Sequence, residues 1–157
     1  MGLSVKIDSE AMIAELRNIA QRANSNAART LKRASIRVRD LARNYAPVDT
    51  GALQESLDYG MKKEGGRNVY LVFVRGDFVK SGGKTVGNYA DIMESELTPY
   101  GNGKYTLGGR SRAKAQSFPV GGKYLERAVD KVSESINDEM MAAAKSALML
   151  SPNGRVR

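Results

Sequence analysis

The chain has no cysteine, no histidine and no tryptophan among its 157 residues. Without cysteine it can form no disulfide, thiol nucleophile or thiolate metal site, and without histidine it lacks the commonest general base and metal ligand. Any chemistry would need carboxylate, lysine, tyrosine, serine or threonine groups, or a metal held by oxygen ligands. None of these has a recognisable spacing here. We therefore expect no enzymatic activity, no cofactor and no bound metal.

Long hydrophobic runs are missing as well. No run approaches the roughly 18 apolar residues that a membrane span needs, and the first residues lack the apolar block of a secretory signal. The content of 41% hydrophobic and 27% charged residues is ordinary for a soluble globular chain. We expect a single domain over residues 1–157, made in the cytoplasm and without a membrane partner.

Positive charge is in excess, with a formal net charge of +8 and a pI near 9.8. Lysine and arginine that neutralise phosphates release counterions, so such a chain suits a polyanionic partner. A solvated helix face explains the same residues, and no recognition-helix or base-stacking pattern supports specific reading of nucleic acid. The candidate interface or phosphate contacts are Arg29, Lys32, Arg33, Arg37, Arg110, Arg112 and Lys114.

Two long helices are predicted, one near each end of the chain. From Ile13 to Tyr45, after a potential N-cap at Asp8, apolar or small residues recur at alternating steps of three and four. A helix of this length would run about 54 Å, so it either breaks near residues 24–26 or projects towards a neighbour. The same spacing from Leu125 to Leu150 predicts a closing helix, followed by a frayed tail at residues 151–157.

The middle of the chain predicts a small sheet. Alternation over residues 57–61 and a β-branched run over residues 69–74 flank a glycine-rich turn, which indicates an antiparallel hairpin. Residues 89–94 fit either a strand or a helical turn, and residues 98–123 lack periodicity, which indicates a long functional loop with a brief strand at 105–107. The prediction is an α+β fold with a long N-terminal helix, a small antiparallel sheet and a C-terminal helix packed on one face of the sheet.

The corner at residues 46–57 joins the first helix to the hairpin. Pro47 must end the helix, and Gly51 permits an unusual backbone angle. Asp49 and Thr50 can cap a short helical turn that places Leu53 and Leu57 on one face. Residues 49–51 also match the Asp-Thr-Gly signature of aspartic proteases, which needs a second copy and an all-β setting. A helix stop followed by a cap explains these residues without catalysis.

Three phrases, taken in order, resemble a known family. The first comprises Ala46, Pro47, Val48, Asp49, Thr50, Gly51, Leu53 and Ser56; the second Tyr89, Ala90 and Glu94; the third Tyr124, Leu125 and Ala128. Their order resembles that of the small neck or tail-completion proteins of long-tailed bacteriophages, typified by the tenth gene product of a lambdoid phage. The chain departs from the family pattern at Gln54, where a basic residue is frequent, and at Ser95-Glu96, where Gly-Thr is usual.

The resemblance implies a structural virion protein of the head–tail junction, made in the host bacterial cytoplasm. Such a neck, tail-completion or connector protein would form a homo-oligomeric ring through which DNA passes. Its partners would be neighbouring neck, connector, tail-terminator or tail-tube proteins. Non-specific contact with DNA is compatible with this role. The first helix and the 98–123 loop are then the expected contact elements. The alternative is a basic nucleic-acid-binding protein that contacts phosphates through the first helix and the loop.

Overall fold

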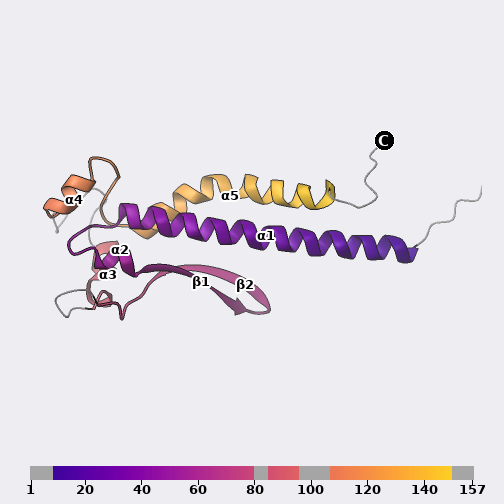
Figure 1. Cartoon of the computed structure of the whole chain (residues 1–157), viewed down its shortest axis with the longest axis horizontal. Helices are drawn as coiled ribbons and strands as arrows, with labels where there is room; N and C mark the ends of the chain where they lie inside the picture. Colours follow the sequence, from indigo (N-terminus) through magenta and orange to yellow (C-terminus); the bar gives the residue numbers. More distant parts are fainter. Residues whose placement is uncertain (1–8, 80–84, 96–106, 150–157) are drawn as a thin grey trace, which may run out of the picture. The chain divides into compact units, whose positions relative to one another are not determined.

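The computed structural model describes residues 9–79, 85–95 and 107–149 (Figure 1). These residues form two compact units. One unit contains the described residues up to Thr30 together with those from Ile136 onwards, and the other contains the described residues from Leu31 to Ser135.

Helix α1 runs from Ser9 to Tyr45, 37 residues without interruption. The predicted long helix is therefore confirmed, and it has no break at residues 24–26; the proposed N-cap Asp8 lies outside the described residues. Ala34, Val38 and Ala42 recur at steps of four and are buried, as the apolar stripe requires. The last backbone bond of the helix runs from the Ala46 N–H to the Ala42 carbonyl at 2.8 Å.

Strands β1 (Leu57–Glu64) and β2 (Arg67–Val74) form the predicted antiparallel hairpin. The register pairs Leu57 with Val74 and Glu64 with Arg67, so only two residues make the turn. Those residues are Gly65 and Gly66, with φ of 55° and 78°. Positive φ at both positions is what a type I′ hairpin turn needs, and glycine adopts it without strain.

In the 31–135 unit, the end of α1 contacts the hairpin on one side and the start of α5 (Tyr124–Met149) on another (Figure 1). The Arg39 guanidinium lies 4.9 Å from the centre of the Tyr59 ring. On the α5 side, Arg127 lies 5.2 Å from the centre of the Tyr45 ring. The core of this unit is built mainly of small and medium side chains: Ala34, Val38, Ala42, Ala46, Ala52, Leu53, Leu57, Val86, Ala90, Val120, Tyr124, Ala128 and Val132.

Two short helices complete this unit, besides α2 (Ala52–Ser56) in the corner. Residues 89–94, ambiguous in sequence, belong to helix α3 (Gly87–Ser95). A Cβ at Gly87 would lie 3.0 Å from the Gly76 carbonyl oxygen, so any other residue would require the Gly76 backbone to shift by a few tenths of an ångström. The prediction of a loop throughout residues 98–123 is corrected, because helix α4 occupies Gly109–Lys114. Most of the strand proposed at 105–107 falls outside the described residues.

The other unit pairs residues 9–30 of α1 with residues 136–149 of α5. The Asn26 amide fastens the two helices, because its Nδ2 donates to the Ala143 carbonyl at 3.1 Å and to the Ser146 hydroxyl at 3.0 Å. Ala147 is fully buried. The α+β class is thus confirmed, with a long N-terminal helix, a two-stranded antiparallel sheet and a C-terminal helix. Among the described residues, no helix has the length and apolar content to cross a membrane.

Candidate functional site

The end of α1 leaves carbonyl groups that the helix itself cannot satisfy. Pro47 has no N–H, so the Arg43 carbonyl loses the partner that the next turn would have supplied. Side chains from elsewhere replace it: Gln54 Nε2 donates to the Arg43 oxygen at 2.7 Å and Lys114 Nζ at 2.6 Å. The Tyr45 carbonyl accepts from the Gly121 N–H at 2.9 Å. The helix end is therefore capped by residues that come from later segments of the chain.

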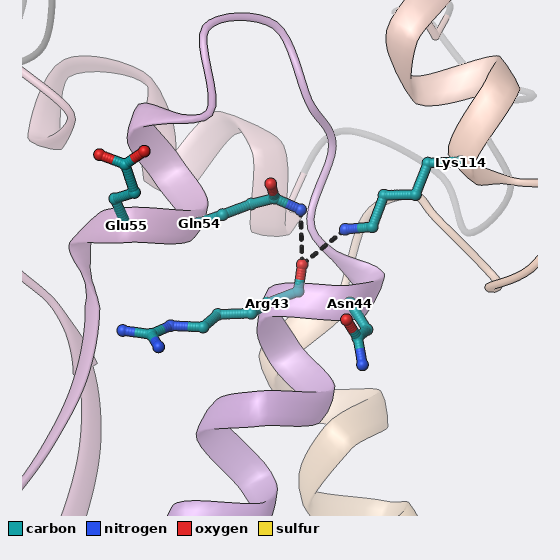
Figure 2. A pocket seen from close by; sticks show the side chains of 5 residues that line it. All are labelled: Arg43, Asn44, Gln54, Glu55 and Lys114. Atoms are coloured by element: carbon teal, nitrogen blue, oxygen red, sulfur yellow. Dashed lines mark hydrogen bonds between the residues drawn. The ribbon is translucent and has the colours of Figure 1, made fainter.

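An open hollow of about 410 Å³ lies at this helix end (Figure 2). Its walls are Arg43, Asn44, Gln54, Glu55 and Lys114. Figure 2 shows the Gln54 amide and the Lys114 ammonium converging on the Arg43 carbonyl. A positive charge at the C-terminal end of a helix also interacts favourably with the helix dipole.

Burial lowers the pKa of Lys114 to about 8, from the usual 10.5. Below the folded pKa, the folded chain must hold a charge that burial disfavours; between about 8 and 10.5 it releases a proton that the unfolded chain still binds. The contribution of Lys114 to stability is thus expected to rise with pH through this window and to level off above it.

The test compares the free energy of unfolding of wild type and Lys114→Met from pH 7 to 11. The free energy of unfolding of wild type, relative to that of Lys114→Met, should increase between about pH 8 and 10.5. Relative to Lys63→Met, at an exposed position of the hairpin, it should not change with pH. A flat curve for Lys114→Met as well would contradict the burial effect.

Ser111, on α4, binds both backbone groups of one corner residue. Its hydroxyl accepts from the Val48 N–H at 2.7 Å and donates to the Val48 carbonyl at 2.9 Å. Arg110 Nη1 donates to the Asp49 carbonyl at 2.8 Å. Since Ser111 is only 2% exposed, this pairing fixes α4 against the corner from inside the fold.

The capping prediction for the corner is only partly right. The N-cap residue, just before α2, is Gly51, with φ of 84° and no side-chain cap hydrogen bond. Thr50 Oγ1 accepts from the Ala52 N–H at a long 3.3 Å, and Asp49 contributes its backbone carbonyl rather than its carboxylate. Leu53 and Leu57 are both buried, but Leu57 begins β1 and does not belong to the helical turn. Ser56 is buried and donates to the Leu53 carbonyl at 2.7 Å.

Glu94, at the end of α3, caps the start of α5. Its two carboxylate oxygens accept from the N–H groups of Leu125 and Glu126, each at 3.1 Å. Its backbone carbonyl accepts from the Lys123 N–H at 2.9 Å. A carboxylate at a helix N-terminus satisfies free N–H groups and complements the helix dipole. This capping residue lies some thirty positions before the helix that it caps, a separation of 31 to Leu125.

The three phrases singled out in the sequence meet in space. Burial raises the pKa of the Tyr89 phenol, and the nearby Asp49 carboxylate raises it further. Burial also raises the pKa of Tyr124, with Glu94, Asp91 and Tyr89 adding to it. Tyr124 is fully buried and Ala90 nearly so. Residues from the corner, α3 and the start of α5 therefore form one cluster.

The chain matches a known protein family over most of its length. Residues 10–126 match the family described as "Bacteriophage HK97-gp10, putative tail-component", which covers all of the first two phrases and the beginning of the third. The chain belongs to this tail-component family. A search of curated proteins and a search of solved structures found no match.

Within this tail-component fold, the seven basic residues proposed as contacts have different surroundings. Arg110 and Lys114 donate to backbone carbonyls of the corner and the α1 end. Arg37 is half-buried on α1. Arg110 is exposed, as are Arg29, Lys32, Arg33 and Arg112. They are the ones whose charges remain available at the surface.

Sequence reasoning missed Ser111 and the roles of Gln54 and Glu94. Ser111 stands in an arginine- and glycine-rich stretch with nothing to distinguish it from a solvated serine. In the sequence Gln54 stands out only as a departure from the family pattern, yet its amide replaces the hydrogen bond that Pro47 removes. Glu94 was recognised as part of a phrase, but capping of a later helix has no local signal. We find no pattern that would have revealed these pairings.

Proposed function

We propose that this tail-component protein is a non-catalytic building block of the head–tail junction, a neck, tail-completion or connector protein that forms a ring by head-to-tail contacts. Family membership supports a structural role among virion proteins. A heterologous contact presses one surface of each subunit against a different surface of the next, and it closes into a ring when the rotation allows. The host cytoplasm would supply the protein, and the virion would hold it.

The observation that carries the proposal is the apolar surface of the unit formed by residues 9–30 and 136–149. Both helices of this unit expose large apolar side chains, each 47–79% accessible: Met12, Ile13, Leu16, Met141, Leu148 and Met149. When two helices pair, each buries only one stripe of its surface. The large apolar side chains that both helices leave exposed are therefore suited to contact with another protein chain. Exposed apolar patches of this kind commonly mark a surface that contacts another protein.

The test is a mass measurement and negative-stain imaging of the purified protein, alone and with the head connector and tail-tube proteins of its phage. A uniform ring, alone or on a partner, is the expected result. Ile13→Asn with Leu16→Asn should reduce assembly at least about tenfold, because it removes two of the exposed apolar groups. Ala11→Asn with Ala14→Asn, at exposed positions on another side of the same helix, is the matched control. A strict monomer that ignores both partners would overturn the proposal.

Sequence-blind contact with DNA is the second candidate. Lys32 and Arg33 favour it, since both are exposed and neither forms an ion pair with a described residue. Phosphate contacts predict duplex binding that weakens steeply with salt and does not depend on sequence. Duplex binding by a protein that never assembles would favour this candidate over the ring.

A further inference from the structure

Lys32 and Arg33 give one face of α1 an uncompensated positive charge. In the 31–135 unit, the α1 residues carry five basic groups and the single acid Asp40. Lys32 and Arg33 lie away from the buried Ala34 and Val38, and both are exposed. Within the described part of the chain, Asp40 pairs with Arg39 at 2.7 Å and no carboxylate pairs with Lys32 or Arg33.

The outward face of α5 in the same unit carries a row of three carboxylates, although basic residues stand beside them in the sequence. Glu126, Asp130 and Glu134 follow at steps of four, so they lie in a row along one side of the helix. All three are exposed, on the side away from the buried Ala128 and Val132. The row spans about 12 Å along the helix axis at 1.5 Å per residue. We call it the α5 carboxylate row.

The α5 carboxylate row is only weakly engaged inside the chain. Glu126 pairs at 2.9 Å with Lys123, just before the helix, and Glu134 pairs at 2.7 Å with Lys131; both pairs are three residues apart in the sequence. Exposed pairs of this kind contribute little and are readily exchanged. Asp130, at the middle of the row, has no ion pair with any described residue. The row can therefore accept cations from outside the chain.

We propose that Lys32 and Arg33 of one copy bind the α5 carboxylate row of the next copy, and that this contact sets the head-to-tail order of the ring. Copies that each carry a net charge of +8 repel one another, so a contact between them needs opposite charges face to face. The two faces belong to different helices, which makes the contact heterologous rather than self-matching. This inference rests on the proposed ring and names its interface.

Helix-surface charges ordinarily do no more than solvate a helix. What distinguishes this case is that groups of opposite charge on two helices, Lys32 and Arg33 on α1 and Asp130 on α5, are left without an ion pair to any described residue. The α1 face presents two unpaired cations, and the α5 row presents carboxylates at three successive positions four residues apart. Charge complementarity of this kind selects partners and fixes their orientation more than it adds affinity. DNA phosphates are the competing anions for Lys32 and Arg33, and the charge-reversal experiment distinguishes DNA binding from contact between copies.

The experiment uses two charge-reversed forms of the full chain. One carries Lys32→Glu with Arg33→Glu, and the other carries Asp130→Lys with Glu134→Lys. A ring made of either form alone would have like charges at every contact between copies, so the concentration needed for assembly should rise at least about tenfold. An equimolar mixture should assemble again, because an alternating ring restores opposite charges at each contact. The control, Lys62→Glu with Lys63→Glu on the exposed part of β1, makes the same change in net charge as Lys32→Glu with Arg33→Glu, away from both faces.

Assembly is followed by mass measurement at low and high salt, with the head connector present if wild type needs it. Loss in both single forms and recovery in the mixture support the inference, and salt should weaken the wild-type ring. If wild type forms rings and both reversed forms do too, this interface is wrong while the ring proposal stands. The same holds if Lys32→Glu with Arg33→Glu loses only duplex binding, which would assign those cations to DNA. If wild type forms no ring with any partner, the proposed function itself fails.

Discussion

Ser111→Ala is expected to destabilise the 31–135 unit by about 2–3 kcal/mol, although the alanine removes a single oxygen atom. The serine hydroxyl satisfies both backbone groups of Val48, at 2.7 and 2.9 Å. Without the hydroxyl, the N–H and the carbonyl of Val48 lose their hydrogen-bond partner together. Leaving a buried group of this kind unsatisfied costs about 1–3 kcal/mol of folding free energy, and less where water reaches the group. Stabilisation of the corner by α4 would be lost at the same time.

Chemical denaturation and the melting temperature measure this effect, at about 2–4 °C for each kcal/mol in a chain of this size. Amide hydrogen exchange gives a local readout, because the Val48 amide should lose protection. Ser117→Ala is the matched control, since Ser117 is exposed and should change stability by no more than about 0.5 kcal/mol. Equal stability of Ser111→Ala and the control would show that α4 is dispensable for the corner.

Glu94→Ala is expected to cost about 1–3 kcal/mol, because it removes the cap from the start of α5. The carboxylate accepts from the N–H groups of Leu125 and Glu126, and an anion at this end also complements the helix dipole. Glu94→Gln keeps one acceptor oxygen but no charge, so its loss should be intermediate. Asp91→Ala, an exposed carboxylate on the same helix, is the control.

The local readout is again hydrogen exchange. The Leu125 and Glu126 amides should exchange faster in Glu94→Ala, while amides in the hairpin should change only with global stability. Fast exchange confined to the start of α5 would establish the cap. An unchanged rate at these two amides would show that the carboxylate contributes nothing to the helix start.

These contacts join the three phrases, which lie far apart in the chain. Val48 and Asp49 of the first phrase are held by α4, Glu94 of the second caps α5, and Tyr124 of the third is buried beside them. Each phrase supplies a group that another segment needs. The Asp-Thr-Gly tripeptide accordingly has a structural explanation: Gly51 adopts φ of 84° to begin α2, and the Asp49 backbone carbonyl binds Arg110.

What the sequence determined by itself was the set of features that depend on near neighbours along the chain. The apolar period predicted α1 up to Tyr45, Pro47 ended it, and the Gly65-Gly66 pair placed the hairpin turn. These follow from backbone sterics and from side-chain spacing within a few residues. Where the local signal was weak, as in residues 89–94 and 109–114, the sequence left the element open or missed it.

Only the tertiary structure decided which distant groups satisfy one another. Pro47 shows in sequence that the Arg43 carbonyl needs a new partner, but not that Gln54 and Lys114 provide it. The same holds for Ser111 with Val48, 63 residues apart. A hydrogen bond needs two groups within about 3 Å, and across such separations that distance is set by the packing of helices and strands rather than by any local preference of the chain.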